Sequence, residues 1–461
     1  VDSTEQELHL FNSSDFSAKA IHVAAYKNQT LSLWNKDRTK SSYSGKYAIN
    51  YWLGDNSGFY ISRSSRDLKR IDLLFVETSG AVKTLVEERS NVYLDIQKPT
   101  LINQGSGFIH WSQRDGWGHY YKYNKEGQLI SQLTQGAFNC VEILGLDEGS
   151  NSFTITANGR EAGEDPYYAH QYRVALDGSA IKLLNPGNFD HQAQAAESGR
   201  YFVSNSSRVN TAPVSALYNS QGQMLLKLEE TDLTQLFAQG YQFPEPFKVK
   251  AGDGVTDLYG VIYKPFDFDS TKTYPLVEYV YPGPQTEVVN KSFGKSMDRL
   301  DRLAQMGFIV VTVGNRGGHP ARSKWYHTYG YGNLRDYGLE DKKVAAEQLA
   351  ARFDYIDLDR VGIFGHSGGG FMSTAAMLVY PDFFKAAVSS AGNHENNIYN
   401  RWWSERHHGV KEKISAKGDT TFTYAIDQNT SLAKNLKGKL MIATGDVDNN
   451  VHPANSIRMV E

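Results

Sequence analysis

Ser367 is the residue of this sequence with the clearest capacity for covalent chemistry. It stands in Gly365-His366-Ser367-Gly368-Gly369, after the strand-like run 361–364 and before a helical segment. A Gly-x-Ser-x-Gly sequence between a strand and a helix is typical of a sharp turn that exposes the serine hydroxyl above a sheet, beside a helix N-terminus. This context favours a nucleophile over a glycine-rich turn that happens to contain serine.

A serine nucleophile needs a base to remove its proton and an acid to hold that base in one tautomer. In a strand-turn-helix arrangement of this kind the chain order is serine, then aspartate or glutamate, then histidine. Asp446 and Asp448 lie in a polar loop directly after the apolar run 440–443. Spacing alone leaves both aspartates open as the acid.

The base is harder to find among the 13 histidines. Only His452 follows Asp448, and a residue so close to the acid would have difficulty folding back between Asp448 and Ser367. We therefore interpret His452 as local structure. The other histidines precede the acid, and His366, next to Ser367, is expected to point away from the turn. The histidine of the triad is thus expected beyond Glu461.

The elements that must position these groups alternate between strands and helices from residue 274 onward. Such alternation predicts a mostly parallel, doubly wound sheet covered on both faces, with sites at the carboxyl ends of its strands. The predicted strands are 274–281, 308–313, 360–364, 384–389 and 439–444, and the predicted helices are 296–306, 339–352 and 369–379.

The first half of the chain repeats a pattern of strands and turns. An aromatic residue after a small or polar turn recurs at intervals of 49, 45 and 48 residues, and a turn glycine recurs at intervals of 47, 51 and 44. A period of about 45–50 residues suits the four-stranded blade of a β-propeller. About four blades are visible, which permits a small complete ring but favours part of a larger one. The positions are Phe59, Phe108, Phe153 and Tyr201, then Gly80, Gly127, Gly178 and Gly222.

The repeat is lost in residues 229–250, which contain Pro244 and Pro246. We therefore predict two domains, an all-β propeller portion in residues 1–240 and an α/β domain in residues 241–461. A length of 461 residues agrees with the presence of more than one hydrophobic core.

The chain opens on Val1 with a polar segment, which we interpret as a processed or excised start.

Composition excludes several function classes. The net charge is −3, with 48 basic and 51 acidic side chains, so a nucleic-acid partner is not expected. No apolar run approaches the roughly 18 residues of a membrane span. Cys140 is the only cysteine and forms no intrachain disulfide. Neither a Cys/His ligand cluster nor a phosphate-binding glycine loop is present, so no metal and no organic cofactor are expected.

At these residues the sequence resembles the prolyl oligopeptidase family, specifically its dipeptidyl peptidase IV branch. The resemblance covers nearly the whole chain and is strongest from residue 274 to 452. It implies a partial β-propeller followed by an α/β-hydrolase domain that is truncated at its C-terminus. The family's Val-Tyr-x-Gly-Pro segment matches Val280-Tyr281-Pro282-Gly283-Pro284, so Tyr281 would donate to an oxyanion with the backbone N–H of Gly368. The family's Gly-x-x-Asp-x-Asn-Val-His segment makes Asp448, not Asp446, the triad acid.

The same resemblance implies a substrate pocket. Asn450 would bind a backbone carbonyl near the substrate's amino terminus. Tyr399 and Trp403 would form the aromatic pocket for the residue before the scissile bond, with Val451 on its wall. A compact, apolar proline or alanine suits such a pocket. The alternative is that Tyr399 and Trp403 are packed core.

The sequence departs from the family pattern in three places. Gly368 stands where this branch often has tyrosine, which puts a strict proline preference in doubt. The glutamate pair that holds the substrate's amino terminus has no clear counterpart, since Glu161 and Glu164 read more simply as a solvated loop. The triad histidine would follow Asp448 by some thirty residues. These departures, with few early blades, suggest a chain cut at both ends.

The resemblance implies a serine exopeptidase that releases dipeptides from peptide amino termini through an acyl-enzyme, with X-Pro or X-Ala preference. An oligopeptidase or acylaminoacyl peptidase on the same scaffold is one alternative. A binding fragment that is inactive because its histidine is missing is another. Relatives often dimerise and are commonly periplasmic or secreted, so a homodimer and those compartments are expectations from the family.

Overall fold

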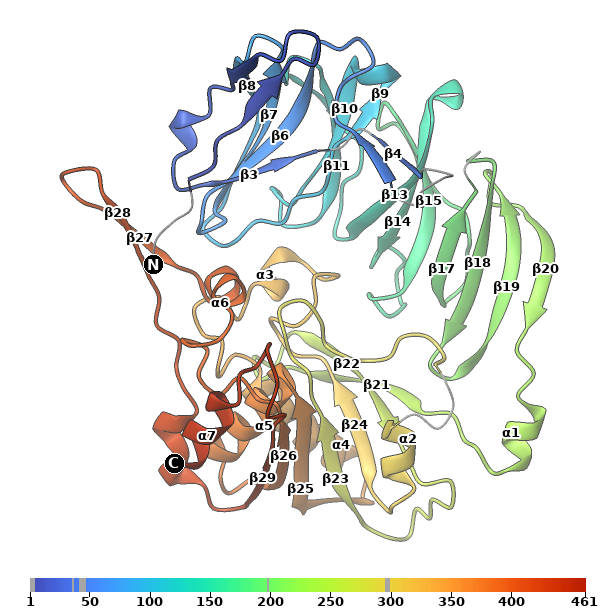
Figure 1. Cartoon of the computed structure of the whole chain (residues 1–461). Helices are drawn as coiled ribbons and strands as arrows, with labels where there is room; N and C mark the ends of the chain where they lie inside the picture. The colour runs from blue at the N-terminus through green and yellow to red at the C-terminus, as the bar shows by residue number, and fades with distance from the viewer. Residues whose placement is uncertain (1–4, 35–36, 41–46, 197–198, 295–298) are drawn as a thin grey trace.

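The computed structural model describes residues 5–34, 37–40, 47–196, 199–294 and 299–461. Two parts are visible in Figure 1: a set of antiparallel sheets formed by the first half of the chain, and a seven-stranded sheet with helices formed by the second half. The last strand of the first part ends at Glu230 and the first strand of the second part begins at Glu245. Helix α1 (Thr234–Ala238) lies in the connection.

Four four-stranded antiparallel sheets lie side by side along an arc, as the blades of a propeller do (Figure 1). The first blade consists of β3 (Thr30–Leu33), β6 (Gly58–Ser64), β7 (Arg70–Glu77) and β8 (Val82–Arg89), and the second of β9 (Thr100–Ile102), β10 (Gly107–Ser112), β11 (His119–Asn124) and β12 (Leu129–Gln132). The third consists of β13 (Asn139–Asp147), β14 (Ser152–Asn158), β15 (Ala169–Ala175) and β16 (Ile181–Leu183), and the fourth of β17 (Asp190–Ala195), β18 (Tyr201–Arg208), β19 (Thr211–Asn219) and β20 (Met224–Glu230). Two hairpins accompany them, β1 (His9–Phe11) with β2 (Ala18–Ala20) and β4 (Asp37–Lys40) with β5 (Tyr47–Asn50).

The two sequence markers occupy equivalent places in all four blades. Each aromatic marker lies at the start of a blade's second strand, and each marker glycine lies in the turn before its fourth strand. The four glycines have φ between 78° and 84°, which favours glycine. A Cβ at Gly178 would lie 2.6 Å from the carbonyl oxygen of Gln132, in the preceding blade. The glycine therefore serves both the turn and the close packing of adjacent blades.

The second sheet has the order β21-β22-β24-β23-β25-β26-β29. Strands β23, β24, β25, β26 and β29 are parallel, and β21 and β22 are antiparallel additions at one edge. This arrangement is the mostly parallel, doubly wound sheet predicted from the sequence. The strands are β21 (Glu245–Lys250), β22 (Asp257–Tyr263), β23 (Tyr274–Tyr279), β24 (Ile309–Val313), β25 (Ile356–His366), β26 (Phe384–Ser390) and β29 (Lys439–Ala443).

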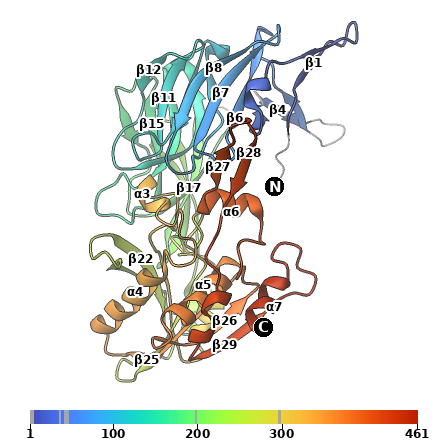
Figure 2. The same cartoon turned by 90° about the vertical axis from the view of Figure 1, so that its left-hand side faces the viewer.

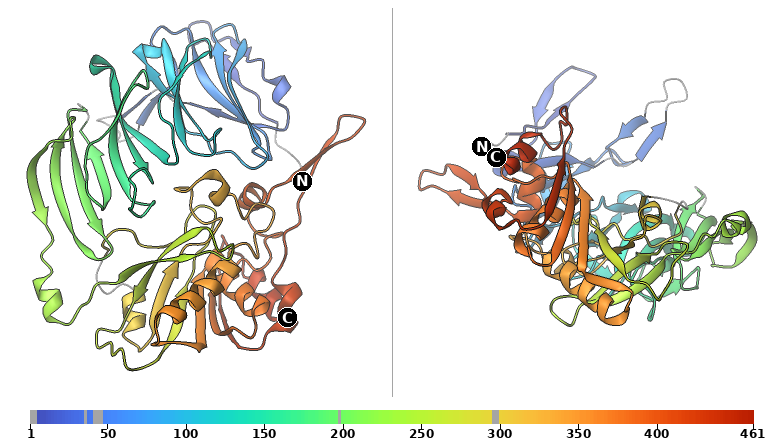
Figure 3. Two further views of the ribbon diagram at one scale, coloured as in Figure 1. Left: turned by 180° about the vertical axis from the view of Figure 1, so that it is seen from behind. Right: turned by 90° about the horizontal axis from the view of Figure 1, so that it is seen from below.

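Helices cover both faces of this sheet. On one face α4 (Leu339–Arg352) and α5 (Gly368–Val379) bury Leu349 and Met377 against the strands; Figure 3 shows the molecule from behind. On the other face α2 (Arg299–Ala304) buries Leu300 and Ala304. The remaining helices are α3 (Lys324–His327), α6 (Arg401–His408) and α7 (Ala454–Val460), with 3₁₀ turns at Ala24–Tyr26, Asn103–Gly105, Glu148–Ser150 and Thr430–Asn435.

Some elements differ from the sequence prediction. β25 is longer than predicted and begins at Ile356, because Tyr274 and its neighbours in β23 pair with it from the start. The predicted helix 296–306 is described only as α2, since part of it lies outside the described residues. α6 and the hairpin β27 (Lys411–Ile414) with β28 (Thr420–Thr423) are short, polar and were not predicted. No helix in the described ranges is long and apolar enough to cross a membrane.

Candidate active site

Ser367 occupies the turn between β25 and α5. Its backbone has φ 56° and ψ −119°, a sparsely populated conformation that costs a non-glycine residue about 1–3 kcal/mol. Its N–H donates to the carbonyl oxygen of Ser390 (2.8 Å), and its carbonyl oxygen accepts from the N–H of Phe371 (3.0 Å). The turn is thus held from both sides, with Ser367 only partly buried at the N-terminus of α5.

The glycines around Ser367 let the ends of neighbouring strands approach it. A Cβ at Gly365 would lie 2.3 Å from the carbonyl oxygen of Val280, and one at Gly369 would lie 2.0 Å from the same oxygen. A Cβ at Gly370 would lie 2.6 Å from the carbonyl oxygen of Ser390. A side chain at any of these positions would push β23 or β26 away from the turn.

The carboxyl ends of four parallel strands are level at this edge of the sheet. Tyr279 pairs with Phe364, His366 with Ser390, and Ser390 with Ala443. The segment after β23 contains Tyr281, the segment after β25 contains Ser367, and the loop after β29 contains Asp448. Because parallel strands end at the same edge, the predicted nucleophile, acid and oxyanion donor share one side of the sheet.

Asp448 is held in a tight turn of its loop. Its Oδ1 accepts hydrogen bonds from the backbone N–H groups of Asn450 and Val451, both at 2.9 Å. These two donors, with a smaller contribution from the nearby His366, hold the pKa of Asp448 below its ordinary value. The carboxylate is therefore ionised at neutral pH, as the acid of a triad must be. Asp446 is exposed and has no such hydrogen bonds among the described residues.

Tyr399 contacts the loop that contains Asp448. Burial raises the pKa of Tyr399, and the charges of Tyr281 and Asp448 raise it further. The Tyr399 hydroxyl donates to Oδ1 of Asn450 at 3.4 Å. Tyr281 is partly buried, and its hydroxyl has no hydrogen-bond partner in the described part of the chain. It is therefore available to a substrate.

An aromatic column extends from Tyr399 along α6. The rings of Tyr399 and Trp403 lie 5.8 Å apart, and those of Trp403 and His407 lie 5.1 Å apart. Burial lowers the pKa of His407 to about 3, so its imidazole is neutral and packs as a small aromatic group. The place of His407 beside Trp403 was not predicted, although the spacing of four residues from Trp403 puts both on the same helix face. Val451, which was predicted to form the wall of the aromatic pocket, is buried, with a relative exposure of 2%.

No histidine of the described residues forms a hydrogen bond with Ser367 or Asp448. His366 is exposed, and its Nδ1 lies 3.0 Å from the hydroxyl of Ser390. His452 accepts from the N–H of Ala454 (3.2 Å) at the start of α7, which is a local role. A base for Ser367 is therefore not supplied within hydrogen-bond distance by this part of the chain.

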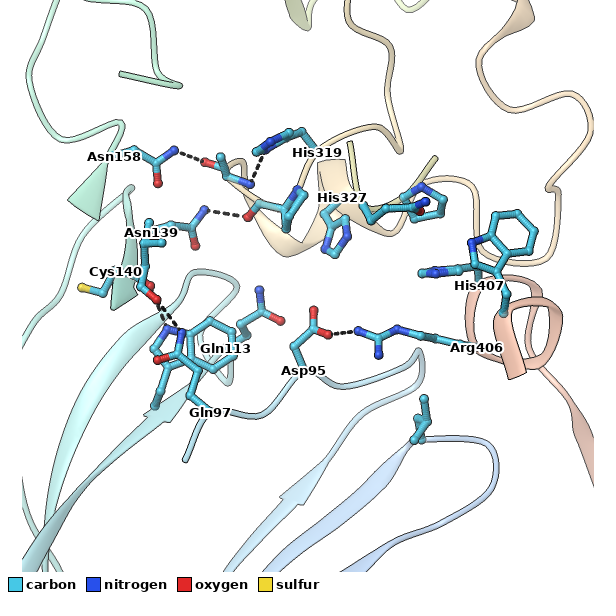
Figure 4. A pocket seen from close by; sticks show the side chains of 18 of the residues that line it. Asp95, Gln97, Gln113, Asn139, Cys140, Asn158, His319, His327, Arg406 and His407 are labelled. Atoms are coloured by element: carbon cyan, nitrogen blue, oxygen red, sulfur yellow. Dashed lines mark hydrogen bonds and ion pairs between the residues drawn. The ribbon is translucent and has the colours of Figure 1, made fainter. Parts of the chain in front are cut away.

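A cavity of about 850 Å³ lies beside the site, between the propeller and α6 (Figure 4). Ser367 and Tyr281 do not line it, but the loop that follows Tyr281 and the ring of Trp403 do. Asp95 of the propeller forms an ion pair with Arg406 of α6 across one side. The lining includes Gln97, Trp111 and Asn139 from the propeller, and Pro284, Gln285, His327, Trp403, Arg406 and His407 from the second part.

The two propeller glutamates considered above face other partners. Glu161 accepts from the hydroxyl of Tyr172 (3.0 Å) and pairs with Arg160, and Glu164 contacts Nε2 of His170 at 2.8 Å. Neither lines the cavity. In the described residues no group of three or more His, Cys, Asp or Glu side chains is arranged to hold a metal ion.

Acidification should destabilise the folded protein through its buried imidazoles. Burial lowers the pKa values of His191, His319 and His394 to about 4 and of His407 to about 3. An unfolded histidine titrates near 6.5, so below that pH the unfolded chain binds more protons, and stability falls between about pH 6.5 and pH 4.

We expect each such histidine to contribute up to about 1.4 kcal/mol of lost stability per pH unit in this window. Thermal melting followed from pH 7.5 downward checks this, with His394→Gln as a variant whose melting temperature should depend less on pH. A melting temperature that stays flat down to pH 5 would contradict it.

The sequence profiles of two known families match the two parts of the chain. Residues 295–461 match the sequence profile described as the prolyl oligopeptidase family. Residues 11–213 match the profile described as the dipeptidyl peptidase IV N-terminal region.

The individual proteins that resemble this chain are named as dipeptidyl peptidases. Dipeptidyl peptidase 8 of Homo sapiens is 30% identical over 303 residues, which is 64% of this chain and 33% of the relative. Dipeptidyl peptidase 4 of Trichophyton rubrum is 25% identical over 474 aligned positions, which cover 98% of this chain and 57% of the relative. The crystal structure of Porphyromonas gingivalis dipeptidyl peptidase 4 has a TM-score of 0.81 at 23% identity, covering 98% of this chain and 61% of that one, and shows a common fold. The chain thus spans between a third and three fifths of the length of these similar proteins.

Proposed function

Because the chain belongs to the prolyl oligopeptidase family as a dipeptidyl peptidase IV-like member, we propose that it is a serine peptidase that releases dipeptides from the amino termini of peptides. The observation that carries the proposal is the strained turn at Ser367, held at a strand edge shared with Tyr281 and Asp448. Strain at a serine between a strand and a helix is characteristic of a nucleophile.

In the proposed reaction the Ser367 Oγ attacks the carbonyl carbon of the second residue while an imidazole takes its proton. The resulting oxyanion accepts hydrogen bonds from the Tyr281 hydroxyl and the backbone N–H of Gly368, the first residue of α5. The imidazolium then protonates the leaving amine, and water releases the dipeptide from the acyl-enzyme. Asp448 orients the imidazole and stabilises its positive charge.

The proposed pocket for the residue before the scissile bond is the aromatic column of Tyr399 and Trp403, with Val451 beside it and Asn450 at its rim. Flat rings and an aliphatic wall suit a compact apolar residue, so we propose X-Pro and X-Ala sequences as substrates. A Cβ at Gly368 would lie 3.0 Å from the carbonyl oxygen of Pro282. No side chain from position 368 narrows this pocket, which favours tolerance of both residues over strict selection of proline.

The experiment that tests this function adds free imidazole to the solution to act as the base. Asp448 and Ser367 are reached by solvent, so free imidazole can take the position of the base. We expect the chain to hydrolyse an Ala-Pro chromogenic amide, and to react with a fluorophosphonate, at rates that rise with imidazole concentration. A chain that reacts with neither, at any imidazole concentration, would refute the peptidase proposal.

Replacing Tyr281 with phenylalanine tests the oxyanion donor. The variant keeps the ring and loses the hydroxyl, so transition-state stabilisation should fall by about 3 kcal/mol, equivalent to a loss of 10²–10³-fold in kcat. KM should change little, because the hydroxyl acts on the developing charge. Tyr274→Phe is a matched control at the other end of β23, where the hydroxyl accepts from the N–H of Asp269. Equal losses in both variants would indicate a general structural effect instead.

A further inference from the structure

Arg66 and Glu405 form a buried ion pair between the propeller and α6. Arg66 lies in the turn between β6 and β7, and its Nε donates to Oε2 of Glu405 at 2.8 Å. Its Nη2 donates to Oε1 of the same carboxylate at 2.5 Å. The two side chains are only 6% and 2% exposed. This two-point contact fixes both the distance and the rotation of the carboxylate.

Glu405 lies on the same short helix as the aromatic column. Trp403 and His407 turn toward the cavity, whereas Glu405 meets the propeller turn. α6 belongs to the excursion between β26 and β29, which leaves the sheet and passes beneath the first blade (Figure 2). Its position therefore depends on the propeller as well as on its own domain.

Two further contacts, between the propeller and the β27–β28 hairpin, lie beside this ion pair. The Arg66 guanidinium lies over the ring of Phe422 in β28, 4.4 Å from its centroid. Arg70, at the start of β7, pairs with Glu412 of β27 at 2.7 Å, but this pair is 39% and 25% exposed. Arg406 of α6 also pairs with Asp95 of the propeller, but these side chains are 40% and 24% exposed. Of these three pairs, the one between Arg66 and Glu405 is the most shielded from water.

We propose that Arg66 is a positioning residue for substrate binding: by holding Glu405 it sets the place of Tyr399, Trp403 and His407 relative to Ser367. The proposal rests on the proposed peptidase function and extends it, because it makes the propeller part of the specificity pocket. Loss of Arg66 leaves the buried carboxylate of Glu405 with only the more distant Arg401, whose Nε lies 3.9 Å away, and α6 moves to hydrate it. The pocket then changes shape while the turn at Ser367, which the sheet holds, does not.

The test compares two readouts in Arg66→Met. Affinity for the dipeptide Ala-Pro, measured by calorimetry, needs the pocket and should weaken on the order of tenfold, which corresponds to about 1.4 kcal/mol. Imidazole-supported labelling of Ser367 by a small fluorophosphonate does not need the pocket and should stay within about twofold of the parent. A general loss of structure would lower both together.

Three variants serve as controls. Arg70→Met breaks the more exposed pair on the same blade and should leave Ala-Pro affinity unchanged. Arg66→Lys keeps the charge without the two-point contact and should restore part of the affinity. Should Arg66→Met fail to fold, Arg66→Met with Glu405→Met removes the unpaired charge and should fold, since apolar groups often replace a buried pair without loss of stability.

Ala-Pro affinity that is unchanged in Arg66→Met and in the double variant would overturn the proposal, as would no binding of Ala-Pro by the parent chain. Equal losses in Arg66→Met and Arg70→Met would also overturn it. Failure of the parent to react with the fluorophosphonate counts against the peptidase chemistry, and the calorimetric comparison still decides the role of Arg66.

Discussion

Ser367→Ala abolishes fluorophosphonate labelling and reduces imidazole-supported hydrolysis of an Ala-Pro amide to the uncatalysed background, by up to about 10⁶-fold. The reason is that the hydroxyl is the only atom of the proposed site that forms a bond to the substrate, and removal of a serine nucleophile elsewhere costs about this much. Labelling is measured by fluorescence after gel electrophoresis, and hydrolysis by release of the chromophore.

The matched control is Ser415→Ala. Ser415 is an exposed serine in the turn of the β27–β28 hairpin, where its hydroxyl accepts from the N–H groups of Lys417 and Asp419. We expect its substitution to leave labelling unchanged. Persistent labelling of Ser367→Ala would show that another residue is the nucleophile, and the assignment of the turn would be wrong.

Asp448→Asn has the second-largest expected effect, a loss on the order of 10³–10⁴-fold in the imidazole-dependent rate. An asparagine oxygen can still accept from the N–H groups of Asn450 and Val451, so the loop keeps its shape. The negative charge is lost, so the imidazolium that forms during the attack is no longer stabilised. The slope of rate against imidazole concentration measures the loss.

Asp446→Asn is the control from the same loop. Asp446 is exposed, lies two residues away, and makes neither of the turn's hydrogen bonds. We expect its rate to remain within about twofold of the parent. Reversal of the two results would return the role of the acid to Asp446, the candidate that spacing alone left open.

The sequence predicts the fold well because both parts depend on local patterns. The strand lengths and turn glycines of the propeller recur with one period, and the core strands of the sheet, such as β24, are continuous apolar runs. Helix α4 matches its predicted bounds because its charged first turn and apolar face are both visible in the sequence. The antiparallel strands β21 and β22 were not predicted, because β21 alternates buried and exposed residues beside the domain junction and the apolar run of β22 is interrupted by Gly260.

The candidate site is predictable only in part. Ser367 is visible because the turn requires glycines at fixed positions around it. Asp448 could be separated from Asp446 only through the family resemblance, since the two hydrogen bonds that lower its pKa depend on loop geometry. The Arg66–Glu405 pair joins residues 339 positions apart, and no local pattern indicates it. Long-range ion pairs of this kind become apparent only once the chain is folded.

The glycine turns of the propeller have a geometric consequence. At Gly80, Gly127, Gly178 and Gly222 bare backbone rests on a carbonyl oxygen of the element before it, where a Cβ would lie 2.5–2.7 Å away. At these four turns backbone meets backbone with no room for a side chain between them. A single methyl group added at any one of them would force the two backbones apart at that turn.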